Sequence, residues 1–212
     1  MNIFRFFADL SHLASIFILL FSIEKNKSLN GLSLKTQTLY VLVFVTRYLD
    51  LFTHFVSLYN TSMKLFFIGS SLYTVYIMTN KYQVSIKAHV DTFPVKYLVG
   101  GAFLAALLTT KSYSPLYLLW TFSIWLESVA ILPHFFVLQR TGEAENITAH
   151  YLFALGIYRA LYIPNWIYRY FTEGRLDWVT VVAGIIQTAI YSDFFYIYYT
   201  KVLKGKKFEL PV

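Results

Sequence analysis

Long apolar stretches, separated by short polar connections, run through the whole chain. A helix needs about 20 residues to cross a hydrocarbon layer of about 30 Å, and somewhat fewer if neighbouring helices shield it. The stretches that approach this length lie at residues 3–22, 34–55, 60–79, 95–110, 114–138, 147–171 and 177–202. The pattern therefore predicts an all-α fold, a single seven-helix membrane domain over residues 1–212 that ends in a tail at 203–212.

The composition supports a membrane protein. The chain is 57% hydrophobic, 20% aromatic and only 14% charged, and its mean hydropathy of +0.54 exceeds what a soluble domain of this size usually has. Its net charge of +7 is dispersed over many segments, and no nucleic-acid-binding module is visible. The chain has no cysteine, and its histidines lack the spacing of metal ligands, so neither a metal nor a cofactor is expected.

The basic residues collect in alternate connections between the predicted helices. One set of connections carries Lys25, Lys27, Lys35, Lys81, Lys87, Lys96, Arg140, Lys201, Lys204, Lys206 and Lys207. The other set carries mainly Lys111 and Arg175. Because positively charged connections face the cytosol, the sequence predicts a lumenal or external N-terminus and a cytosolic C-terminus.

Ionisable residues interrupt several of the predicted helices. They are His12, Arg47, Asp50, Glu127, Arg159 and Asp193. A charged side chain in hydrocarbon costs about 2.5 to 3.5 kcal/mol, so we expect these side chains to face inward on a shared polar cavity. That cavity is the predicted site of function.

The two halves of the chain resemble each other weakly. The run SLKTQTLYVLVFVTRYLDL aligns with GEAENITAHYLFALGIYRALYI when Arg47 is placed opposite Arg159, 112 residues later. This alignment predicts two three-helix repeats joined by the fourth helix, although chance similarity of two apolar helices is the alternative. In the second half, Pro164 is expected to kink its helix, because proline lacks an amide donor and its ring clashes with the preceding turn.

Longer motifs carry a resemblance to a known family. They are DLSHLASI, TRYLDLFTHFVSLYNTSMK, WTFSIWLESVAILPHFF, TGEAENITAHYLFALGIYRALYIPNWIYRYFTEG and YSDFFYIYYTKVLKGKKFELP. The chain resembles the KDEL receptors, or ER lumen protein-retaining receptors, along nearly its whole length and least between about residues 83 and 113. The resemblance implies a Golgi and ER membrane receptor that binds the C-terminal KDEL or HDEL tetrapeptide of escaped ER lumenal proteins and returns them in COPI-coated retrograde vesicles. It also implies a fold similar to the SWEET and PQ-loop transporters.

The ligand suggests which residues bind it, because a peptide ending in Asp-Glu-Leu carries three carboxylates and guanidinium groups pair well with carboxylates. By resemblance, Arg47 with Tyr48 binds the terminal carboxylate, and Arg5 and Arg169 bind the acidic side chains. The full implied ligand-binding set is Arg5, Arg47, Tyr48, Asp50, His54, Tyr117, Trp120, Arg159, Tyr162, Asn165, Trp166 and Arg169.

The first ligand residue, Lys or His, is expected to meet the Asp50 carboxylate and the face of Trp120. An intrahelical salt bridge between Arg47 and Asp50 is the alternative for this carboxylate. The chain departs from the family here, because Tyr117 stands where members usually carry an acidic residue and His54 borders the same ligand residue. The missing negative charge should weaken a preference for Lys and favour His or another residue.

Retrieval requires binding in the mildly acidic Golgi and release in the near-neutral ER, and histidine titrates between these conditions, near an ordinary pKa of about 6.5. His12 is the predicted sensor, since its protonation adds positive charge near an anionic ligand. The resemblance places Tyr158 and Glu127 in the associated hydrogen-bond network.

The C-terminal region carries the predicted sorting residues. By resemblance, Lys201, Lys204, Lys206 and Lys207 present a signal to the COPI coat, and Asp193 is linked to retrieval. A plain positive-inside anchor is the simpler role of these lysines. Glu143 and Glu145 are assigned to a cytosolic sorting surface, but Lys87 stands where the family often has an acidic residue, which puts that surface in doubt.

A proton-coupled small-solute transporter of the PQ-loop or SWEET type is the rival prediction, because buried carboxylates and a histidine are also the parts of a proton relay. Against it, the triplet LPH lacks the glutamine of the PQ motif, and three arginines suit a polyanionic peptide better than a neutral solute. We do not expect an enzyme, since no nucleophile–base pair or phosphate-binding loop is visible.

Overall fold

The computed structural model describes residues 2–27, 29, 31–82, 90–141, 143–144, 146–174, 176–200, 204 and 208–209. The chain divides into two compact units, the first made of Met1–Leu32 with Val137–Val212 and the second of Ser33–Phe136. The described elements are helices, apart from a two-residue antiparallel pair, and this confirms the all-α prediction. In that pair, β1 (Glu143–Ala144) lies against β2 (Phe208–Glu209).

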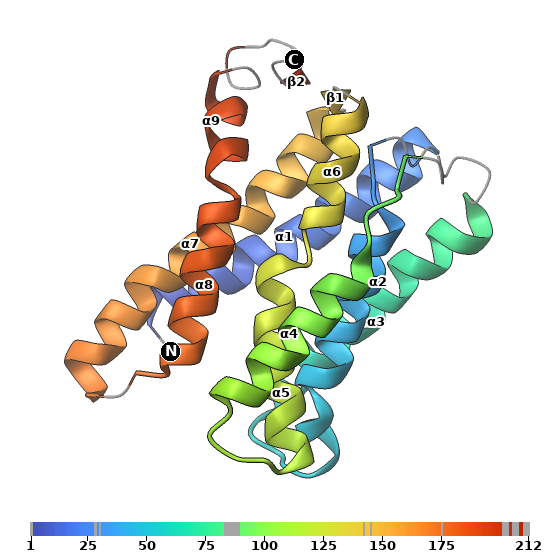
Figure 1. The fold of residues 1–212 in the computed structure, drawn as a ribbon. Coiled ribbons are helices and arrows are strands. Elements are labelled where there is room, and N and C mark those ends of the chain that lie inside the picture. The colour runs from blue at the N-terminus through green and yellow to red at the C-terminus, as the bar shows by residue number, and fades with distance from the viewer. Residues whose placement is uncertain are drawn as a thin grey trace. The chain divides into compact units, whose positions relative to one another are not determined.

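The first unit is built on two long helices that pack side by side, α1 and α7 (Figure 1). A further helix, α8, also packs against α7, and α9 follows it. The bounds are α1 (Ile3–Asn26), α7 (Asn146–Glu173), α8 (Trp178–Ile190) and α9 (Ser192–Thr200). Ala8 of α1 and Leu152 and Leu155 of α7 are buried in this unit.

The second unit is organised around α2, which packs against both α3 and α5, while α4 packs on α5 (Figure 1). Its elements are α2 (Leu34–Arg47), the 3₁₀-helix η1 (Leu49–Phe52), α3 (Leu58–Tyr76), the π-helix η2 (Ile77–Lys81), α4 (Val95–Thr109), α5 (Pro115–Val129) and the start of α6 (Leu132–Thr141). The predicted site residues of this unit lie at the end of α2, in and after η1, and in α5.

Serine residues cap α2, α3 and α5 of the second unit. The Ser33 hydroxyl accepts from the Thr36 amide at the start of α2, and it also lies 3.0 and 3.1 Å from the two Asp91 carboxylate oxygens. Ser114 caps α5, where Pro115 occupies the first turn. A side-chain oxygen at this position pairs an amide that the helix leaves unsatisfied, and proline at the first turn has no amide to satisfy.

Several predicted segments are interrupted where the sequence suggested one continuous helix. The segment 34–55 leaves the α-helix after Arg47, and the segment 177–202 is divided at Tyr191. The segment 114–138 is broken at residues 130–131, just before Pro133, whose ring and missing amide disfavour a continuous helix. Pro164 lies inside α7, which continues through it, and the kink expected there stays a prediction.

Within the described residues, three helical segments are long and apolar enough to cross a membrane. They are Ile3–Asn26, Pro115–Thr141 and Trp178–Thr200, and Val95–Thr109 is a shorter apolar helix. A membrane bundle fits these segments, whereas the seven-helix repeat architecture stays a prediction.

Candidate functional site

A cavity of about 380 Å³ opens in the second unit at the ends of α2 and η1 and the start of α5. It collects five of the predicted ligand-binding residues from segments about 60 residues apart. Its lining is Thr46, Arg47, Leu49, Asp50, Thr53, His54, Ser114, Leu116, Tyr117 and Trp120. The cavity therefore combines the aromatic side chains of Tyr117 and Trp120 with one basic residue, Arg47, and one acidic residue, Asp50.

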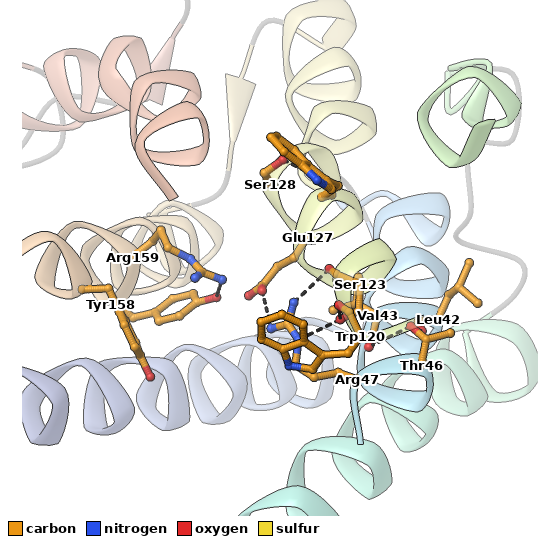
Figure 2. A network of polar contacts seen from close by, with 12 residues as sticks. Leu42, Val43, Thr46, Arg47, Trp120, Ser123, Glu127, Ser128, Tyr158 and Arg159 are labelled. Carbon is orange, nitrogen blue, oxygen red and sulfur yellow. Dashed lines mark hydrogen bonds and ion pairs between the residues drawn. The ribbon is translucent and has the colours of Figure 1, made fainter. Parts of the chain in front are cut away.

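Arg47, the last residue of α2, is held by α5. Its Nε donates to the Ser123 hydroxyl at 3.1 Å, and one of its terminal nitrogens donates to the Ser123 carbonyl at 2.9 Å. The other terminal nitrogen forms an ion pair with the Glu127 carboxylate (Figure 2). The side chains of Arg47 and Glu127 are 13% and 1% exposed, so this is a buried ion pair. The alternative of an Arg47–Asp50 salt bridge is wrong.

Asp50 instead pairs with a residue that the sequence reasoning missed. The Lys64 ammonium, from α3, lies 2.6 Å from Asp50 Oδ2 and 5.9 Å from the centre of the Tyr48 ring. Asp50 Oδ1 is buried and has no hydrogen-bond partner within the described residues. A lysine near the start of the apolar segment 60–79 was a usable signal, because buried lysines are normally paired.

Two large aromatic side chains and a histidine also line the cavity. Tyr117 and Trp120 lie one helical turn apart on α5, with ring centres 5.5 Å apart and tilted planes. His54 is exposed, and its Nδ1 lies 2.8 Å from the Thr53 hydroxyl. The structure thus places His54, Tyr117 and Trp120 on one cavity, as the sequence reasoning grouped them.

In the first unit, the predicted pH-sensing histidine lies between α1 and α7. His12 is buried and stacks on Tyr158, with ring centres 4.2 Å apart and planes inclined by 9°. Arg159 donates to the Tyr158 hydroxyl at 2.7 Å, and its guanidinium lies over the rings of Tyr158 and Tyr162 at 4.9 and 5.6 Å (Figure 2). This contact pattern brings His12, Tyr158, Arg159 and Tyr162 together.

Two hydrogen bonds join the N-terminal part of the chain, at and just before the start of α1, to α7. The Tyr162 hydroxyl donates to Asp9 at 3.1 Å, and Asp9 lies 3.9 Å from the Arg5 guanidinium. The Asn2 amide donates to the Asn165 side-chain oxygen at 2.8 Å. Asp9 and Asn2 were not among the predicted site residues, although an aspartate four residues after an arginine in an apolar helix is a signal for a pair.

Two further predicted ligand-binding residues lie near the end of α7. Trp166 packs against the Tyr162 ring at 5.8 Å between centres. Arg169 donates to Glu173 from two nitrogens, at 2.9 and 2.7 Å, and both side chains are nearly half exposed. The guanidinium of Arg169 is therefore engaged by a carboxylate of its own helix.

The predicted sorting residues are only partly described. Asp193 is exposed in the first turn of α9, where the helix dipole favours a carboxylate. The Lys204 ammonium lies 5.9 Å from the centre of the Tyr199 ring, and the backbone of Glu143 pairs with that of Glu209. Outside the described residues lie Lys87, Glu145, Lys201, Lys206 and Lys207.

Comparison with known proteins identifies similar chains over the full length. A family model described as ER lumen protein retaining receptor matches residues 28–169. ER lumen protein-retaining receptor 2 of Gallus gallus is 58% identical over 211 residues, with 100% of both chains covered. The proteins of the same name from Bos taurus and Homo sapiens are 58% and 57% identical over the same length and coverage.

Proposed function

The chain belongs to the ER lumen protein-retaining receptor family, and on this premise we propose that it captures escaped ER lumenal proteins by a KDEL- or HDEL-type C-terminal tetrapeptide. It binds them in the Golgi at acidic pH and releases them in the ER at neutral pH. The relatives are named as receptors, which fits a binding protein rather than an enzyme.

The observation that carries this proposal is the position of Arg47 on the cavity wall. Contacts to Ser123 fix two edges of its guanidinium, so the group is already oriented and loses little freedom when it binds an anion. Arg47 is paired with Glu127 in this structure, and a ligand carboxylate that arrives must compete with that carboxylate. A planar, buried guanidinium beside aromatic walls suits the terminal carboxylate of a peptide.

The other residues of the proposed ligand-binding set belong to the first unit. We assign Arg5 and Arg169 to the acidic side chains of the peptide, where their present partners Asp9 and Glu173 are carboxylates of the same kind. Binding at these positions would exchange an internal carboxylate for one of the ligand. Arg159, Tyr162, Asn165 and Trp166 complete the proposed ligand-binding set.

The proposed pH dependence rests on His12. The imidazole stacks on Tyr158, whose hydroxyl accepts from Arg159, so a proton on His12 adds positive charge to a group of residues that already holds a guanidinium. An anionic ligand stabilises that protonated state more than the empty receptor does. Affinity should therefore be high below the range in which histidine titrates and should fall as the pH rises through it.

Transport requires features beyond the ligand site, and these remain proposals. A lumenal N-terminus and a cytosolic tail would place the lysines around Lys204 where the COPI coat can bind them, and Asp193 would act in retrieval. The exposure of both residues is consistent with such contacts.

Replacing Arg47 with alanine should weaken binding of a peptide ending in Lys-Asp-Glu-Leu or His-Asp-Glu-Leu by at least about 30-fold, because loss of one buried charged partner costs about 2 kcal/mol or more. The measurement is peptide affinity at mildly acidic pH on the purified full-length protein. Arg140→Ala, which removes an exposed arginine in the last turn of α6, is the control and should leave affinity within about twofold. Equal affinities for the Arg47 variant and the control would remove Arg47 from the site.

A further inference from the structure

Gly184, in the middle of α8, lies where this helix packs against the Trp166 side chain of α7 in the first unit. A Cβ atom at Gly184 would overlap the indole at Cη2, and it would lie 2.7 Å from Cζ3 and 3.3 Å from Cζ2. Carbon atoms that are not bonded do not approach this closely in folded proteins, because repulsion rises steeply below van der Waals contact. The outer edge of the indole therefore rests on the bare backbone of α8.

The backbone conformation at Gly184 does not itself require glycine. Among the glycines that the structure describes, φ is positive at Gly31 and Gly174, whereas Gly184 lies inside the α-helix α8. Glycine is less favourable than alanine in a helix interior, because it loses more conformational freedom on folding. The close approach of Trp166 is thus the feature of the structure that accounts for glycine at this position.

Trp166 in turn packs on other residues of the proposed ligand-binding set. Its ring centre lies 5.8 Å from that of Tyr162, and the two ring planes are inclined by 48°. The Tyr162 hydroxyl donates to Asp9 at 3.1 Å, and Asp9 lies 3.9 Å from the Arg5 guanidinium. A displacement of the indole therefore reaches Tyr162 directly, and it reaches Arg5 through one hydrogen bond and one ion pair.

We propose that Gly184 is a positioning residue of the peptide site, which leaves room for the Trp166 indole to pack against Tyr162 in one orientation. This rests on the proposed function, because Trp166 and Tyr162 are proposed ligand contacts. Gly184 acts without touching the ligand. It lets two ligand-binding side chains be held in place before the peptide arrives, so that less freedom is lost on binding.

Gly184→Ala should weaken binding of a peptide ending in Lys-Asp-Glu-Leu or His-Asp-Glu-Leu by about tenfold or more, because the added methyl group displaces the indole. The measurement is affinity per folded receptor at mildly acidic pH, on the purified full-length protein. Gly156→Ala is the matched control, since a Cβ there crowds the Phe195 and Tyr191 rings, which are outside the proposed ligand-binding set. The folded control should bind the peptide within about threefold of the unmodified receptor.

Trp166→Phe tests whether the effect passes through the indole, because phenylalanine keeps a ring on α7 and lacks the outer edge that meets Gly184. In the Trp166→Phe background, Gly184→Ala should change the affinity by less than about threefold, and this comparison holds even if Gly184→Ala alone does not fold. A larger loss in that background, or a folded Gly184→Ala receptor that binds like the unmodified one, would overturn the proposal. Failure of the unmodified receptor to bind either peptide would instead contradict the proposed function itself.

Discussion

Glu127→Ala lowers the free energy of unfolding by about 3 to 5 kcal/mol, the range expected when one partner of a buried ion pair is removed. Glu127 is 1% exposed, and its carboxylate is paired with Arg47. Removing it leaves a guanidinium that is 13% exposed and keeps only its two contacts to Ser123. The measurement is equilibrium or thermal unfolding of the purified protein in detergent.

The double variant Arg47→Met with Glu127→Met is the matched control, because it removes both charges and restores apolar volume. A buried pair replaced in this way often costs little, so the double variant should be clearly more stable than Glu127→Ala. If the single and double variants are equally destabilised, the loss comes from packing, and the ion pair does not account for it. An unchanged stability of Glu127→Ala would contradict the buried pair altogether.

Gly156→Ala is the second substitution with a large expected effect, a loss of about 1 to 3 kcal/mol in the free energy of unfolding. Gly156 is buried in α7, and a Cβ there would lie 2.6 Å from the Phe195 ring and 2.7 Å from the Tyr191 ring. Tyr191 is 0% exposed, so its ring has nowhere to move without disturbing the core of the first unit. The same unfolding experiment measures the loss.

Gly101→Ala provides a control of the same chemistry. Gly101 lies on an exposed position of α4, and a Cβ there would meet no atom within 4 Å. Alanine in a helix is favoured over glycine, so this variant should gain about 0.5 to 1 kcal/mol. If both alanine variants change stability in the same direction, crowding at Gly156 is not what sets its effect.

The helices could be predicted from the sequence because lipid-length apolar runs leave few alternatives. The predicted runs 3–22, 60–79, 95–110 and 147–171 correspond to α1, α3 with η2, α4 and α7. The break before Pro133 also had a local cause in the sequence. At Pro164 the helix α7 continues, and whether it bends there, as a proline inside a helix predicts, stays a prediction.

The partners of the charged residues were harder to predict than the residues themselves. Arg47 and Asp50 were recognised as important, but a single sequence gave no way to pair Arg47 with Glu127 on α5 or Asp50 with Lys64 on α3. Such pairs depend on which helix faces meet. The Arg169–Glu173 pair, in contrast, follows from a spacing of four residues on one helix and could have been predicted.

The central claim is that the cavity receives the free carboxyl end of another protein, and one titration tests it most directly. Peptides ending in Lys-Asp-Glu-Leu or His-Asp-Glu-Leu, each with a free or an amidated C-terminus, are compared on the unmodified receptor at mildly acidic and at neutral pH. We expect at least one free-acid peptide to bind, more tightly at acidic pH, and its amide to bind at least about 30-fold more weakly, since a charged partner of a buried guanidinium is lost. Equal binding of acid and amide, or equal affinity at both pH values, would contradict the account.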